Sequence, residues 1–335
     1  MVNNLQIVLH APLMNLQFPA NAFLIYDVMI SVATFDILPT DDIFPNFFRD
    51  LPQDDSYTDK FARLKISSRF LIMNMGTMLL VFCFYCTLFI LYPCCRALRN
   101  DAKCARKNTH SMHKMLFWSH PILFLQEGYL DILIAASINM IFLKEGELGW
   151  SEVSLILTNV LSILMITACS FLFFFVAIYL WPRFEKLKTR QFRKKYKPIY
   201  EMLNLRRGRS TLLWPLIFML RRALFVVAVC ALADYTEMQI YLFMLPTIAS
   251  MTILASVNPL ESITANRLEI FNSFSILLMS YCLMAFTPLV LDPQARYTMG
   301  FVMVGLTGIN VLTNIIVVSI DPMRKTCMRC KVHWG

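Results

Sequence analysis

The chain has 335 residues, of which 57% are hydrophobic and only 16% are charged, and its formal net charge is +9. A soluble domain carries about 25% charged residues, so this composition excludes an ordinary soluble fold. The apolar residues come in runs of about 20, the length that a helix needs to cross a hydrocarbon core about 30 Å thick. In lipid each span must satisfy its own backbone hydrogen bonds, and these runs do not alternate as barrel strands do. The sequence therefore predicts an all-α integral membrane protein.

The first 68 residues contain no strong span. They hold eight aspartates, and their apolar strip near the start is short. We expect an extracytoplasmic N-terminal segment at 1–68. A chain that opens in such a strip is also expected to be the C-terminal part of a longer protein, in which Met1 is internal.

Seven apolar segments follow, each long enough for a membrane helix. They predict a bundle of about seven transmembrane helices, within a domain at 69–320, and a basic tail at 321–335. The predicted spans lie at about 70–92, 115–143, 153–181, 211–233, 239–257, 270–291 and 298–320.

A strongly basic loop at 183–210 sets the orientation. Residues 183–209 carry eleven Lys or Arg against two acids. Positively charged loops are retained on the inner side of a membrane. With this loop inside, the inner segments and the tail hold 22 of the 31 basic residues. We therefore expect the N-terminus outside, the C-terminus inside, a cytoplasmic basic loop and tail, and a multi-pass protein of the plasma membrane.

The basic residues are sorted by loop, so they indicate membrane topology and not a nucleic-acid partner. The expected partners are membrane lipids, including anionic lipids of the inner leaflet. Part of the basic loop is amphipathic and is expected to lie along that leaflet, either as a regulatory lipid site or as a passive anchor. The residues expected to contact lipid are Arg193, Lys194, Lys195, Lys197, Arg206, Arg207 and Arg209.

Cysteine usage agrees with this topology. None of the ten cysteines falls in a predicted outer loop, so no disulfide framework is expected. Cys94 and Cys95 lie at the predicted inner end of the first span, beside Arg96. That position suits reversible palmitoylation, and the alternative is a pair of unmodified interfacial thiols.

Ionisable residues inside a span are costly and usually face a partner or a water-filled cavity. Glu127 and Asp131 are four residues apart in the second predicted span, which places them on one helix face. Arg221 and Arg222 lie inside the fourth predicted span at a similar depth. We expect an intramembrane polar centre of these four residues. Its functional form lines an ion path or a ligand cavity, and its structural form fixes helix packing.

Motifs of other function classes are absent from the sequence. It contains no Walker loop, no GxGxxG, no GxSxG, no selectivity-filter sequence of the TVGYG type and no arginine at every third position. Nothing predicts an enzyme, a catalytic residue, a metal site or a cofactor.

Several short motifs carry a resemblance to a known family. The chain resembles the C-terminal membrane region of large ciliate surface proteins, which place a Cys-rich, growth-factor-receptor-like ectodomain before the spans. It is also distantly similar to the TRP-like membrane domain of the fungal flavin-carrier family. The motifs are Phe18–Phe23, Phe35–Thr40, Asn74–Thr77, Tyr179–Arg183, Tyr200–Leu203, Arg221–Arg222 and Asn266–Phe271.

The resemblance implies a membrane domain of a channel or transporter type, with no filter residues to carry over. Three functions are therefore weighed. The first is a TRP-like cation channel or transporter subunit, for which a homo-oligomer would be expected. The second is a seven-span receptor, although the receptor triplet after span 3 and the NPxxY pattern of span 7 are absent. The third is a membrane anchor for a Cys-rich ectodomain that this chain lacks.

Overall fold

The computed structural model describes residues 2–33, 61, 68–75, 77–97, 113, 115–146 and 148–333. Every regular element in these ranges is helical, which confirms the all-α expectation for them. Leu203 and Leu260 form an isolated β-bridge outside any strand.

Four helices in the described ranges are long and apolar enough to cross a membrane, as a multi-pass membrane protein requires. A bent pair, Leu116–Glu127 with Tyr129–Lys144, adds a fifth if the two halves form one span. The predicted count of seven spans and the predicted orientation stay predictions. The four are Val153–Leu180 (α10, Val153–Phe174, and the π-helical turn η4, Phe175–Leu180), Arg209–Ala231 (η6, Arg209–Leu212, and α13, Leu213–Ala231), Thr236–Val257 (α14) and Pro293–Ile320 (within α16, Pro293–His333).

The other predicted spans also correspond to helices, with different limits. The first corresponds to α5 (Leu71–Asn74) and α6 (Thr77–Ala97), whose apolar part, Leu80–Cys94, is shorter than the four. The sixth corresponds to α15 (Ile263–Met284), which begins inside the predicted connector and so includes Glu269. At the end of the chain, α16 continues as one helix through most of the predicted tail.

The second predicted span is not one straight helix. It consists of η3 (Met115–Ser119), α8 (His120–Glu127) and α9 (Tyr129–Lys144), and the chain bends by 72° between α8 and α9. Gly128 lies at the bend with an ordinary φ of −87°. A Cβ there would come within 3.3 Å of the Phe124 carbonyl oxygen and would meet the end of Met78 from α6. Space, and not a left-handed backbone, is therefore what favours glycine at this position.

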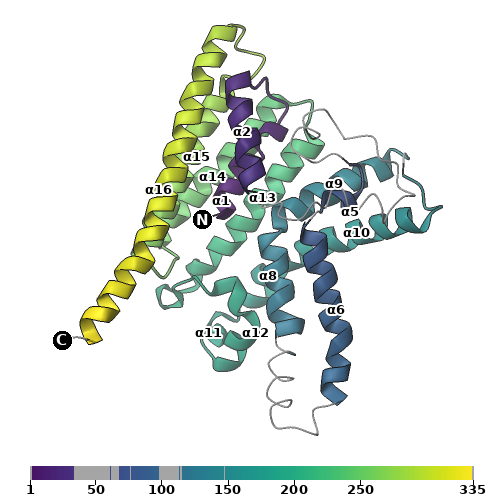
Figure 1. Cartoon of the computed structure of the whole chain (residues 1–335), viewed down its shortest axis with the longest axis vertical. Helices are drawn as coiled ribbons and strands as arrows, with labels where there is room; N and C mark the ends of the chain where they lie inside the picture. The colour runs from purple at the N-terminus through teal and green to yellow at the C-terminus, as the bar shows by residue number, and fades with distance from the viewer. Residues whose placement is uncertain are drawn as a thin grey trace.

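The helices fall into two groups (Figure 1). From α13 to α16 each helix packs against the next, and α14, α15 and α16 follow the long axis of the molecule. In the same view α9 and α10, which pack together, run across that axis, and α9 also contacts α13. The basic loop forms α11 (Phe184–Leu187) and α12 (Arg190–Tyr200), drawn below α13 and beside α8.

The start of the chain is part of the helical core. Helix α1 (Val2–Leu9), the turn η1 (Ala11–Leu13) and helix α2 (Ala20–Ala33) pack against α15 and α16. Ile7, Met14 and Leu16 are at most 2% exposed. Such burial of apolar side chains contributes roughly 1.5–3 kcal/mol each. The described part of the N-terminal segment is therefore bound to the helices along its length.

Backbone and amide hydrogen bonds fasten this segment to two interhelical turns. At the α13–α14 turn, the Asn15 backbone N–H donates to Gln239 Oε1 (2.8 Å) and its side chain donates to the Ala233 carbonyl (3.0 Å). At the α15–α16 turn, the Gln17 backbone N–H donates to the Phe286 carbonyl (2.8 Å). Both turns lie at the same end of their helices, so the segment joins them across that end.

A glycine allows α2 to approach α16. A Cβ on Gly300 would come within 2.8 Å of Pro19 Cγ and would also clash with the Asn21 amide. By contrast, a Cβ on Gly305 or Gly308, further along α16, would meet no atom within 4 Å. Gly305 and Gly308 therefore make no such close approach to another described helix.

Replacing Gly300 by alanine is expected to push the start of α2 away from α16. Overpacking of this kind costs about 1–3 kcal/mol, against a gain of up to about 1 kcal/mol in helix propensity. Gly305→Ala shares the propensity gain without the clash, so it should be neutral or stabilising. The measurement is thermal unfolding of the two purified variants in the same detergent. Equal melting temperatures would contradict the contact.

Candidate functional site: a polar centre between α1, α9 and α13

Two arginines are buried near the middle of a candidate span. Arg222 is 0% exposed and Arg221 is 3% exposed. The Arg222 guanidinium lies over the Phe218 ring, 3.7 Å from its centroid, one turn earlier on α13. Burying a charge is costly unless the protein replaces water with hydrogen bonds and opposite charge. The surroundings of Arg222 therefore define the candidate site.

One hydrogen-bond acceptor for Arg222 comes from the first helix of the chain. Arg222 Nη2 donates to Gln6 Oε1 at 3.0 Å, although the two residues are 216 positions apart. Gln6 lies on α1, whose burial places its amide at the α13 surface. The sequence predicted a polar centre of Glu127, Asp131, Arg221 and Arg222, and the structure adds the neutral amide of Gln6 to the surroundings of Arg222.

His10 continues the chain of contacts from Gln6 to Asp131. It follows α1 by one residue, and its Nδ1 lies 2.7 Å from the Gln6 carbonyl oxygen. Its Nε2 lies 3.5 Å from Asp131 Oδ1, in the first turn of α9. Arg222, Gln6, His10 and Asp131 thus form one connected set, which we call the polar centre.

The geometry constrains the protons of His10. A carbonyl oxygen can only accept, so Nδ1 must carry a hydrogen. The opposite nitrogen faces a carboxylate. An ion pair there needs a doubly protonated ring, and a neutral ring can interact only by accepting from a protonated Asp131. Both side chains are partly exposed, 18% for His10 and 40% for Asp131.

The two arginines interact electrostatically with different acidic residues. Successive residues of an α-helix point about 100° apart. Accordingly, the carboxylates whose charges act on Arg222 are Asp131 and Glu127, whereas the charge of Glu269 on α15 acts on Arg221. The Arg222 guanidinium of α13 thus contacts α1 through Gln6.

The expectation that Glu127 and Asp131 share one helix face was wrong. Glu127 ends α8 and Asp131 begins α9, on opposite sides of the 72° bend. The Glu127 side chain is exposed, whereas Asp131 is partly enclosed. Of the four residues predicted, Asp131 and Arg222 thus belong to the connected set. Gln6 and His10 were missed, and their i, i+4 spacing was the only signal that could have suggested a shared face.

A second buried polar cluster joins α15 to α16, and no motif predicted it. Asn272 Oδ1 accepts from Asn310 Nδ2 at 3.0 Å and from Asn314 Nδ2 at 2.7 Å. In return, Asn272 Nδ2 donates to Asn314 Oδ1 at 3.1 Å. All three side chains are at most 5% exposed. These amides satisfy one another, as hydrogen-bonded side chains between membrane helices do, so the cluster fixes the pairing of the two helices.

The predicted lipid-contacting residues lie around α12 and the turn η5 (Leu205–Arg207). Lys195 Nζ lies 4.8 Å from the centroid of the Trp118 ring, and Lys197 Nζ lies 2.7 Å from Glu201 Oε1. Arg207 donates to the Asn258 carbonyl. Arg206 and Arg209 are exposed, as a lipid contact requires. The side chains of Arg193 and Lys194 are not among those that the structure describes.

A buried tyrosine anchors α12 beneath these cations. Tyr196 packs edge-on to Trp118 and against Phe175, with ring centroids 5.3 Å apart in both cases. Burial raises the pKa of Tyr196 above its usual 10, and the neighbouring Tyr179 adds to the effect. The ring therefore stays neutral and holds the basic helix against η3 and η4.

Cys94 is exposed at the end of α6, whereas the Cys95 side chain lies outside the description. Palmitoylation of the pair stays a prediction. Across the part of the chain that the structure describes, no three His, Cys, Asp or Glu side chains are grouped so as to hold a metal ion.

No family model, curated protein or solved structure matches this chain. The residues and their geometry are therefore the basis for any statement about function.

Gln6→Leu is expected to destabilise the protein, because it removes a hydrogen-bond acceptor from a buried guanidinium. Hydrogen bonds to charged groups contribute about 1.5–3 kcal/mol. Gln294→Leu is the matched control, since Gln294 is exposed at the start of α16 and should change stability by less than about 0.5 kcal/mol. Chemical or thermal unfolding of both variants in one detergent gives the comparison. A loss as small for Gln6→Leu as for the control would refute the link.

Proposed function

We propose that the chain is the membrane domain of a TRP-like cation channel or transporter subunit, and that its conduction path passes the polar centre. The observation that carries the proposal is the set of contacts that links a buried arginine in a candidate span to a partly exposed carboxylate in the bent helix pair. An ionisable residue at membrane depth usually marks a pathway for ions or protons. Arg222 lies nine residues before the end of its candidate span, which is about 14 Å along the helix.

Arg222 and Asp131 differ in how deeply they are buried, and this difference supports the proposal. Arg222 is fully enclosed and holds α1 through Gln6, so it suits a positioning role. The Asp131 side chain, by contrast, is 40% exposed and can offer a carboxylate oxygen to a passing cation. His10 Nε2 faces the same carboxylate, 3.5 Å from Asp131 Oδ1. We expect Asp131 to carry the cation contact.

A membrane anchor for a preceding ectodomain is the second candidate function. The observation that favours it is the fastening of residues 15–17 across the α13–α14 and α15–α16 turns. An ectodomain of the Cys-rich kind, which the ciliate resemblance implies, would be held there against both helix pairs. In this case the polar centre serves packing.

The test is whole-cell current with ion substitution, in cells that express the chain with a tag verified at the surface. Asp131→Asn keeps the shape and removes the charge. A loss of about 1.5 kcal/mol in cation stabilisation corresponds to a roughly tenfold fall in current or a clear shift in selectivity. Glu145→Gln is the matched control, because Glu145 is an exposed acid just after α9 and should leave the current unchanged.

Either of two results would count against the transport proposal. The first is no current from the chain despite verified surface delivery, which would favour the anchor. The second is an equal change in both variants, which would show that general surface charge, and not Asp131, sets the current.

A further inference from the structure

A hollow lies where the basic loop meets the ends of two candidate spans. It has a volume of about 280 Å³ and lies between α11, α12, the turn η5 and the connector from α14 to α15. One candidate span ends at Leu180 and the next begins at Arg209. The residues between them therefore join the ends of two candidate spans. The hollow is distinct from the polar centre.

The wall of the hollow is held by backbone hydrogen bonds. The Asn204 N–H donates to the Pro259 carbonyl (2.8 Å), and the Glu261 N–H donates to the Met202 carbonyl (2.9 Å). Asn258, just before this pairing, has a left-handed φ of 48°, a conformation that asparagine tolerates better than most residues. The loop is thus fixed to the connector, and the cavity does not depend on side chains alone.

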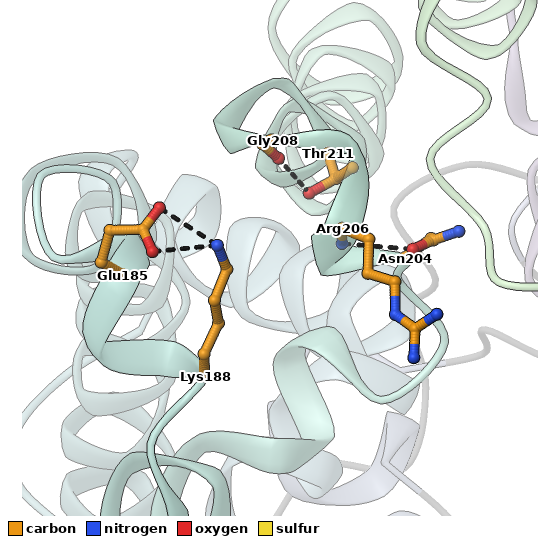
Figure 2. A network of polar contacts seen from close by, with 6 residues as sticks. All are labelled: Glu185, Lys188, Asn204, Arg206, Gly208 and Thr211. Atoms are coloured by element: carbon orange, nitrogen blue, oxygen red, sulfur yellow. Dashed lines mark hydrogen bonds and ion pairs between the residues drawn. The ribbon is translucent and has the colours of Figure 1, made fainter.

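Three cations line the hollow, from three different elements, together with two acids, Glu201 and Glu261. Lys188 follows α11, Lys197 lies on α12 and Arg206 lies on η5. Figure 2 shows Lys188 and Arg206 extending from separate segments. The Arg206 backbone N–H donates to Asn204 Oδ1 (3.2 Å), which fixes the turn and leaves the guanidinium to project from it. Among the residues described, no acid pairs with that guanidinium.

The two lysines are paired only at the surface. Lys188 Nζ lies 2.9 Å from Glu185 Oε2, and Lys197 Nζ lies 2.7 Å from Glu201 Oε1. Both pairs are about half exposed or more, and exposed ion pairs contribute little net stability. A phosphate could replace either glutamate at small cost. Since Arg206 is free to offer a planar, forked donor set that matches phosphate oxygens, the hollow is suited to a phosphate group.

Apolar groups at the same place favour a lipid over a soluble phosphate. Leu187, Tyr200 and Leu205 line the hollow together with the cations. At its edge, the large apolar side chains of Met202 and Ile263 are 76% and 64% exposed. Cations beside exposed apolar side chains are typical of a surface at the boundary between headgroups and acyl chains.

We propose that this hollow binds the phosphate of an anionic phospholipid, with Arg206 as the main ligand and Lys188 and Lys197 as supporting cations. The inference deepens the expectation of lipid contact along the basic loop. It does not depend on whether the protein conducts ions, so its failure leaves the transport proposal intact.

The test measures the affinity of the purified full chain, in a nonionic detergent, for dioctanoyl phosphatidic acid. Arg206→Ala keeps the backbone N–H that forms the turn, so folding should be retained. Loss of a charge-assisted hydrogen bond should raise the Kd about tenfold. Lys186→Ala is the matched control. Lys186 is exposed on α11 and does not line the hollow, so its replacement should leave the Kd within about twofold.

Three further probes separate the sources of phosphate. Dioctanoyl phosphatidylcholine, whose headgroup has no net charge, should bind much more weakly than phosphatidic acid. Glycerol 3-phosphate and inorganic phosphate lack acyl chains and should also bind much more weakly. Equal binding of either soluble phosphate would overturn the lipid assignment. Equal losses in Arg206→Ala and Lys186→Ala would overturn the site itself, since only general charge would then matter.

Discussion

A buried guanidinium must be hydrogen-bonded by the protein, and this constraint organises the described structure. Arg222 is sealed from solvent in the middle of an apolar helix, where water cannot serve it. Its oxygen partner comes from Gln6, at the opposite end of the chain. The N-terminal helix must therefore be in place before α13 is fully satisfied. That requirement couples the start of the chain to the helices that end it.

The same segment is held by two independent kinds of contact. Near residue 6 it contributes a polar group to the interior, and near residues 15–17 it fastens two turns at the end of the helices. Between them, Met14 and Leu16 are buried among apolar side chains. Withdrawal of the segment would expose apolar surface, break the turn contacts and leave Arg222 without Gln6. All of these contacts would be lost at the same time, so the segment and the helices should unfold as one unit.

The sequence alone predicted the helices well, but it predicted the side-chain contacts between them poorly. Long apolar runs predicted α10, α13, α14 and α16, because lipid allows few other structures. The same rule cannot detect the bend at Gly128, since a glycine in an apolar run leaves hydropathy unchanged. The arginine pair was evident from the sequence, because burying a charge in a membrane span is costly unless another group binds it. Gln6 and the asparagines at 272, 310 and 314 were not, because neutral amides carry no charge pattern and their contacts are distant in sequence.

Adjacent arginines give α13 a role that a single charge could not provide. Arg222 faces the side of α1 and α9, and Arg221 experiences the charge of Glu269 on α15. The group that contains α9 is thereby linked to the group of α14 to α16. The polar centre thus depends on the N-terminal segment for Gln6 and His10, on α13 for Arg222 and on α9 for Asp131.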